Sequence, residues 1–207
     1  MKGPRLLIGG GSACLLAILV LALAAHQYPY FGWDPPLTRA VQSVPVGPFY
    51  QVVLFYGWLL GVRQVALAAA GVVLVLIFNR WGGLLMVGGA LSAAVYQVLD
   101  LVVHRPRPDP HLVHVVAATP SSSFPSGHVV FFTWFSILLV ITLGRRLPPP
   151  LKAAAWVLAA LVIVVTAFCR VWAGAHWPSD VLAGFLLGAG WTLLVVGAGR
   201  TWIPRAL

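Results

Sequence analysis

The chain has 207 residues, of which 60% are hydrophobic and only 8% are charged. A soluble domain carries about 25% charged residues, so this composition excludes a soluble globular protein. Several apolar runs approach the ~20 residues that a membrane-spanning helix needs. None of them alternates apolar and polar residues as the strands of a transmembrane barrel do. We therefore expect an all-α, polytopic membrane helical bundle.

The first apolar run covers residues 6–25 and follows Lys2 and Arg5. It is longer than the ~7–15 apolar residues of a signal peptide, which favours an uncleaved first span over a cleaved leader. Residues 28–48 then contain five prolines. Such a composition cannot continue a helix, and it predicts an external loop or interfacial segment.

The next apolar stretch, residues 49–78, is too long for one span and is interrupted by Gly57, Gly61 and Arg63. It predicts a short aromatic-rich helix at the membrane interface over 49–60, followed by a second span over 62–78. Four further spans are expected at 82–103, 128–144, 152–169 and 179–198. The sequence thus predicts six transmembrane helices, plus short interfacial helices, in a single domain over residues 1–207.

Thirteen Lys and Arg against four Asp give a formal charge of +9. These charges lie in short loops between apolar runs and form no basic stripe interleaved with aromatic residues, so we expect no nucleic-acid partner. With the N-terminus in the cytoplasm, eight basic residues lie inside and five outside. All four acids, and five of the six His within residues 104–180, then lie toward the outer face. This pattern predicts a plasma (bacterial inner) membrane protein with both termini cytoplasmic and its active site at the outer face.

Three segments carry the polar residues at that face: 104–108, 125–128 and 170–180. Arg107 and Arg170 offer planar guanidinium groups that bind phosphate oxygens in pairs. Ser126 and Gly127 open the fourth span, where unpaired backbone N–H groups and the helix dipole favour an anion. Together these residues predict a phosphate-binding site.

Two histidines complete the predicted site. One imidazole attacks phosphorus while the other, when protonated, donates to the leaving alkoxide, so that hydrolysis proceeds through a phosphohistidine. Asp180 lies four residues after His176, and we expect its carboxylate to accept from one ring nitrogen and leave the other free. The hypothesis assigns His176 as nucleophile and His128 as general acid.

The chain resembles the type 2 phosphatidic acid phosphatase (lipid phosphate phosphatase) family, which shares its site with vanadium-dependent haloperoxidases. The motif core is residues 100–180: Arg107-Pro108, the run 125–128 that reads Pro-Ser-Gly-His, and Arg170, His176 and Asp180 at the family's spacing. The resemblance implies metal-independent hydrolysis of a membrane lipid phosphate or diphosphate with no cofactor. Its substrates would be of the phosphatidic acid, phosphatidylglycerol phosphate or undecaprenyl diphosphate class.

Two positions depart from the family pattern. Cys169 stands where the family has Ser, and Asp100 stands where it has Lys, which adds an anion and removes a phosphate-facing cation. We expect Asp100 to face His104 and Arg105 at the end of the third span, to position Arg107 through that segment, and to leave part of the missing cation's work to Arg105. The departure keeps open an alternative, a non-catalytic or weakly active membrane protein that binds or transports a lipid phosphate.

A metal site is the remaining alternative. His111 and His114 lie three residues apart, but Asp109 is the only further ligand at a useful spacing. The sequence therefore predicts no metal.

Overall fold

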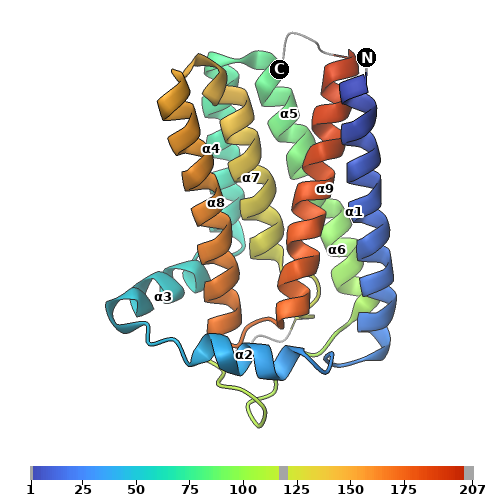
Figure 1. The fold of residues 1–207 in the computed structure, drawn as a ribbon, viewed down its shortest axis with the longest axis vertical. Coiled ribbons are helices and arrows are strands. Elements are labelled where there is room, and N and C mark those ends of the chain that lie inside the picture. The colour runs from blue at the N-terminus through green and yellow to red at the C-terminus, as the bar shows by residue number, and fades with distance from the viewer. Residues whose placement is uncertain (1, 117–120, 203–207) are drawn as a thin grey trace.

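The structure, a computed structural model, describes residues 2–116 and 121–202. These residues form an upright bundle with no strand in the described part, as predicted (Figure 1). The helices are α1 (Lys2–Gln27), α2 (Asp34–Gln42), α3 (Tyr50–Trp58), α4 (Val62–Phe78), α5 (Arg80–Ala90), α6 (Ser92–Val103), α7 (Gly127–Leu143), α8 (Pro149–Trp172) and α9 (Pro178–Trp202).

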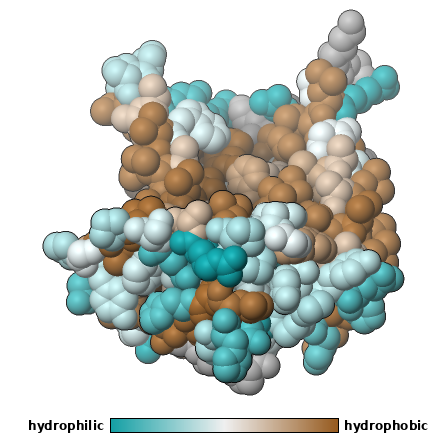
Figure 2. Space-filling model, turned by 60° about the horizontal axis from the view of Figure 1, so that its bottom comes forward, coloured by the Kyte–Doolittle hydropathy of each residue, from teal (hydrophilic) through white to brown (hydrophobic). Residues whose placement is uncertain are grey.

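Five of the described helical segments are long and apolar enough to cross a membrane, and a sixth is counted if α3 and α4 form one bent span. The beginning of α1 and the end of α9 lie at one end of the bundle, and α2 and α3 lie at the other (Figure 1). We call the end that carries α2, α3 and residues 104–116 and 121–126 the polar end. Hydrophilic residues gather there, whereas the flanks of the bundle are hydrophobic (Figure 2). The predicted count of six spans therefore fits the fold.

Residues 28–48 do not continue the first helix, as predicted, but they contain the separate helix α2. Pro35 and Pro36 occupy its first turn, where their missing N–H groups would have no intrahelical acceptor and their fixed φ suits the helix. The prolines end α1 and then begin α2. Proline composition alone indicated a break and did not reveal the new start.

The third predicted span, 82–103, is confirmed as a candidate span over Arg80–Val103, although Leu91 interrupts it between α5 and α6. The division of residues 49–78 is confirmed: α3 and α4 meet at 85°. Gly61 lies in this bend with φ of +62°, a conformation that favours glycine. The bend turns the aromatic α3 across the polar end, in the place of the predicted interfacial helix.

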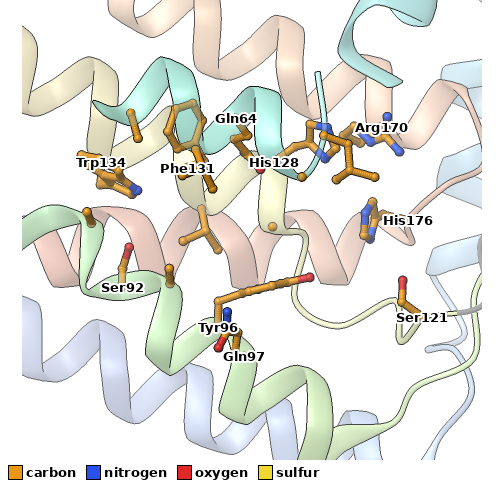
Figure 3. Close-up of a pocket in the computed structure, with 18 of the residues that line it drawn as sticks. Gln64, Ser92, Tyr96, Gln97, Ser121, His128, Phe131, Trp134, Arg170 and His176 are labelled. Carbon is orange, nitrogen blue, oxygen red and sulfur yellow. The ribbon is translucent and has the colours of Figure 1, made fainter. Parts of the chain in front are cut away.

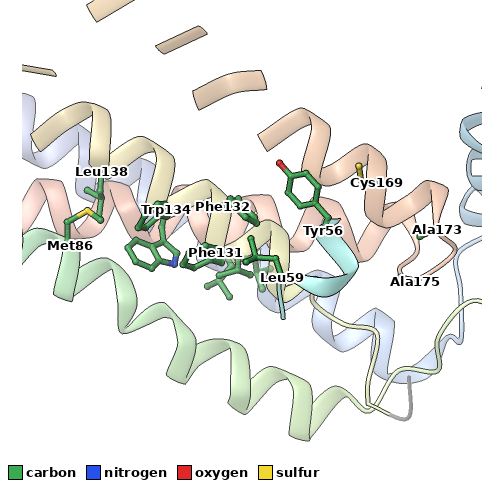
Figure 4. Close-up of a cluster of buried hydrophobic side chains, with 14 of the residues drawn as sticks. Tyr56, Leu59, Met86, Phe131, Phe132, Trp134, Leu138, Cys169, Ala173 and Ala175 are labelled. Atoms are coloured by element: carbon green, nitrogen blue, oxygen red, sulfur yellow. The ribbon is translucent and has the colours of Figure 1, made fainter. Parts of the chain in front are cut away.

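Helix α7 is the centre of the bundle, since 72% of its spanning window is buried against 17% for α1. The hydrophobic core follows α7 and includes Phe131, Phe132 and Leu138 (Figure 4). Tyr56 of α3 packs its ring edge-on against Phe132 at 5.2 Å between centroids. This packing holds the end of α3 against the beginning of α7, where the candidate site lies.

Candidate active site

The three predicted segments converge at the polar end of the bundle. They are the stretch after α6, the loop before α7 and the turn between α8 and α9. A cavity of about 530 Å³ opens among them and continues between α4 and α6 (Figure 3). Five of the predicted site residues line it: Arg107, Gly127, His128, Arg170 and His176.

Three of the predicted site residues around this cavity each have a buried polar atom with no hydrogen-bond partner in the described structure, namely Ser126 Oγ, His128 Nε2 and Arg170 Nε. Their residues are 0%, 3% and 8% exposed. A buried polar group left unpaired destabilises a protein by about 1–3 kcal/mol, so three of them around one cavity indicate a missing polar ligand. Since two of the atoms belong to donor groups of Arg and Ser, the ligand is expected to be an oxygen-rich anion.

Arg107 is held by backbone and hydroxyl oxygens, with no carboxylate bound to it. Its Nη1 donates to Ala175 O at 2.6 Å, and its Nη2 donates to Ser121 Oγ at 2.8 Å and Ser122 O at 3.0 Å. Burial lowers the pKa of the Arg107 guanidinium, an effect that Tyr96 and two acids partly offset. These neutral partners fix the group in place and leave its positive charge for a ligand in the cavity.

The first turn of α7 faces the cavity at Gly127. A side chain at this position would crowd Tyr96, whose ring carbon Cζ lies 3.0 Å from the place of a Cβ atom. The expectation that both Ser126 and Gly127 offer free N–H groups was wrong in part, because Ser126 N–H donates to Asp180 O at 3.0 Å. The helix begins one residue later, and the groups of its first turn remain without intrahelical acceptors.

His176 lies in the turn between α8 and α9, with one ring nitrogen bound to the protein. Its Nδ1 is 2.7 Å from Ser123 O, so Nδ1 carries the proton in the neutral ring and donates it to that carbonyl. The Nε2 atom is 3.4 Å from Arg107 Nη1. Burial, and then the charges of Arg107 and Arg170, hold the pKa of His176 well below its usual range. The neutral ring thus presents an unprotonated Nε2 toward the arginines.

The expected contact between Asp180 and His176 is not formed. Asp180 Oδ1 accepts from Arg105 Nη1 at 2.5 Å, and Oδ2 accepts from Trp177 N–H at 2.9 Å. Both carboxylate oxygens are therefore occupied by other donors. The carbonyl of Ser123, in place of the Asp180 carboxylate, accepts from His176 Nδ1. No signal in the sequence identifies a backbone carbonyl as this acceptor.

His128 is the second imidazole at the cavity (Figure 3). The backbone of Tyr56 and Leu59, where α3 ends, lies close enough to this ring to act on it. Since the Nε2 atom has no partner in the described structure, it is the nitrogen available to a ligand. The end of α3 thus lies beside this ring.

The segment around Asp100 differs from the hypothesis. His104 Nδ1 lies 3.2 Å from Leu101 O, and Arg105 turns away from Asp100 to Asp34 and Asp180. Arg105 therefore does not replace the missing cation in the cavity. One carboxylate oxygen of Asp100, Oδ1, is buried without a partner, and Arg107 is the charge that acts on it most strongly.

Two residues of this region were missed by the sequence analysis. Ser123 provides the carbonyl for His176, and Asp34 of α2 is fully buried against Arg105. Asp34 is one of only four acids in the chain, which is the one signal that could have singled it out. Among the described residues no three His, Cys, Asp or Glu side chains gather as a metal site.

The structure is a membrane-type helical bundle in which two arginines, two histidines and a helix N-terminus converge on one cavity. The chain belongs to the PAP2 superfamily, whose family model matches residues 81–203. This finding confirms the family resemblance of the sequence.

Relatives of known name extend the comparison. Phosphatidylglycerophosphatase B of Bacillus subtilis is 30% identical over 190 residues, which cover 88% of this chain and 91% of that protein. An undecaprenyl-diphosphatase of Sulfolobus acidocaldarius is 29% identical over 122 residues, and a decaprenylphosphoryl-5-phosphoribose phosphatase of Mycobacterium tuberculosis is 33% identical over 116. These two matches span 56% and 55% of this chain, and 55% and 59% of the relatives' own lengths.

A solved structure shares the fold over its whole length. It is a transmembrane PAP2-type phosphatidylglycerolphosphate phosphatase from Bacillus subtilis, with a TM-score of 0.79 and 23% sequence identity. The match covers 99% of this chain and 100% of the solved one. The arrangement of the bundle is therefore that of a membrane PAP2 protein.

Proposed function

We propose that the protein hydrolyses a lipid phosphate or diphosphate without a metal ion, through a phosphohistidine at His176. The observation that carries the proposal is the state of His176. Its Nδ1 is engaged with Ser123 O, and its Nε2 lies beside Arg107 in a cavity lined by a second imidazole. A neutral imidazole with one fixed N–H and one free nitrogen is a nucleophile directed at whatever the arginines bind.

In the first step of the proposed reaction, Arg107 and Arg170 bind oxygens of the terminal phosphate. His176 Nε2 forms a bond to phosphorus while the bond from phosphorus to the leaving oxygen breaks. Protonated His128 gives its Nε2 proton to that leaving oxygen. The arginines and the first turn of α7 stabilise the charge that spreads over the phosphoryl oxygens in the transition state.

In the second step, His128 is neutral and accepts a proton from water. The water oxygen bonds to phosphorus, the bond from phosphorus to His176 Nε2 breaks, and inorganic phosphate leaves with His128 protonated again. Ser126 Oγ and Arg170 Nε, unpaired in the described structure, are then donors to the same oxygens.

The substrate class follows from what surrounds the phosphate site. The cavity continues into an apolar part lined by Val65, Ala68, Ala93, Val130 and Phe131, which suits the hydrocarbon part of a lipid. The named relatives act on glycerolipid and polyprenyl phosphates alike. The proposed site recognises the phosphate group of the lipid. The proposal therefore covers phosphatidic acid, phosphatidylglycerol phosphate and undecaprenyl diphosphate as one class.

Asp100 favours the alternative, a lipid-phosphate binder with weak or no turnover. Its partly buried carboxylate interacts electrostatically with Arg107 and opposes a bound anion. The discriminating assay measures phosphate released from a panel of lipid phosphates by the detergent-solubilised protein with a chelator present. Release from at least one lipid, abolished in His176→Ala, is the expected result. Folded protein that binds these lipids and releases no phosphate would support the binder.

The proposed location is the plasma (bacterial inner) membrane, with both termini cytoplasmic and the polar end outside. It rests on the excess of Lys and Arg at the end of the bundle that carries the termini. Single cysteines at His111 and Lys152, in a background without Cys14 and Cys169, test this orientation. His111→Cys should react with an impermeant thiol reagent on intact cells, and Lys152→Cys should react only after the cells are opened. The reverse pattern would invert the topology.

A further inference from the structure

A buried ionic cluster lies beside the cavity and takes no part in the proposed chemistry. At its centre, Arg105 Nη2 donates to Asp34 Oδ2 at 3.0 Å and Nη1 donates to Asp180 Oδ1 at 2.5 Å. All three side chains are fully buried. Ser179 joins them: its hydroxyl donates to Asp34 Oδ2 and accepts from Arg105 Nη1, each at 2.7 Å. The cluster thus connects α2, the stretch after α6 and the start of α9.

The cluster supports His176 from two sides. The Ser123 N–H donates to Arg105 O at 2.8 Å, and the Ser123 carbonyl is the acceptor for His176 Nδ1. On the other side, Asp180 Oδ2 accepts from the N–H of Trp177, the residue that follows His176. Arg105 therefore fixes both the carbonyl that sets the tautomer of the ring and the turn that carries the ring.

Asp34 is the member of this cluster that comes from outside the catalytic segments. It precedes residues 81–203, which the family model matches. Its carboxylate accepts from four donors, namely Arg105 Nη2, the Ser179 hydroxyl, the Ser179 N–H and the Phe31 N–H. A fully buried carboxylate with this many donors is fixed in one orientation, and it fixes the orientation of the Arg105 side chain as well. Figure 1 shows α2 lying across the ends of α8 and α9, where this contact forms.

We propose that Asp34 is a positioning residue for the reaction. It keeps Arg105 between the two carboxylates and so holds the Ser123 carbonyl and the Trp177 turn at the distances that aim His176 Nε2 at phosphorus. It touches neither Arg107 nor Arg170, and binding of the phosphate itself does not depend on it. This inference rests on the proposed function of His176 as nucleophile.

The test compares Asp34→Asn with the unchanged protein in detergent, by turnover and by two inhibitors. A misdirected nucleophile should lower kcat by about 10–100-fold. Inorganic phosphate, which the arginines bind, should keep its Ki within roughly 2-fold, because uniform binding is retained. Orthovanadate, which resembles the transition state when it bonds to His176 Nε2, should bind about 10-fold or more weakly. A partly unfolded preparation would lose turnover without moving either Ki.

Thr38→Val is the matched control, because Thr38 is equally buried on α2 and its hydroxyl bonds only the Asp34 backbone carbonyl in the described structure. It should leave kcat and both Ki values unchanged. If Asp34→Asn does not fold, Ser179→Ala loosens the same cluster without removing charge and should weaken vanadate more than phosphate.

Three outcomes would overturn the inference: kcat of Asp34→Asn within about 3-fold of the unchanged protein, both inhibitors weakened equally, or the same pattern in Thr38→Val. An unchanged protein without phosphatase activity would instead refute the proposed function.

Discussion

Two arginines that lie two residues apart, Arg105 and Arg107, have opposite surroundings. Arg105 is buried between two carboxylate side chains and pairs with both of them. Arg107 is bound by carbonyl and hydroxyl oxygens and faces the cavity that His176 lines. A buried cation that is paired with acids is part of the fold, whereas one held only by neutral acceptors is available to an anion. The contrast separates the structural half of this segment, at Arg105, from the half that we propose to bind phosphate, at Arg107.

The largest expected effect concerns the general acid. His128→Ala should lower turnover of a lipid phosphate by about 10²–10⁴-fold, because the leaving alkoxide then departs without a proton. A phosphate ester of an activated phenol needs no such proton and should recover most of this loss. Steady-state rates of the variant on both substrates make the comparison. Equal losses on both would remove His128 from its assigned role.

The next prediction compares substitutions of Arg107 and Arg105 directly. Arg107→Gln should lower kcat/KM by about 10²–10³-fold with little change in thermal stability. Arg105→Gln leaves Asp34 and Asp180 buried without a cation, which should destabilise the fold by about 3–5 kcal/mol. Thermal unfolding and steady-state kinetics on the same preparations measure both. A stable Arg105→Gln with an intact rate, or an unfolded Arg107→Gln, would reverse the assignment.

The pH dependence sharpens the same contrast with a smaller effect. His176 must be neutral to attack, and burial with Arg107 and Arg170 holds its pKa well below the usual value. A lowered pKa keeps the ring neutral to lower pH, so the acid limb of kcat/KM should lie below about 6.5. Arg107→Gln removes one of these charges and should move the limb to higher pH.

The matched control for this shift is Arg39→Gln. Arg39 is an exposed arginine at the polar end, on α2, and should leave the limb in place. An acid limb that does not respond to Arg107→Gln would mean that the titrating group is not His176.

The smallest expected effect is at Asp100. Its carboxylate acts on Arg107 electrostatically but has no hydrogen bond to it in the described structure. Asp100→Ala should therefore lower kcat/KM by no more than about 5-fold, the equivalent of the ~1 kcal/mol of a partly exposed charge pair. Asp100→Lys should not restore a large rate, because the site already holds two arginines. A large gain in kcat/KM for Asp100→Lys would show that the carboxylate faces the phosphate.

The sequence predicted the bundle and the arginines and histidines that line the cavity, because hydrophobic length and motif spacing are local properties. The spans, the bend before residue 62, and the meeting of Arg107, His128, Arg170 and His176 all follow from such signals. Partner choice at the site was not local. Asp180 pairs with Arg105 because the fold brings the start of α9 beside the stretch after α6. Arg105 pairs with Asp34 because α2 crosses the polar end. Motif spacing singled out the second of the two Arg-Pro pairs, and only the fold shows that the first is paired with two acids.

The most direct test of the account traps the intermediate. The protein, incubated with a lipid phosphate labelled with ³²P in the terminal group, is quenched with alkali during turnover. The account expects label on the peptide that contains His176, stable to base and released by acid, as a phosphoramidate bond requires. The label should be absent from His176→Ala and present in Arg39→Gln. Active protein that carries no label, or label bound to any other residue, would contradict the assignment of His176 as nucleophile.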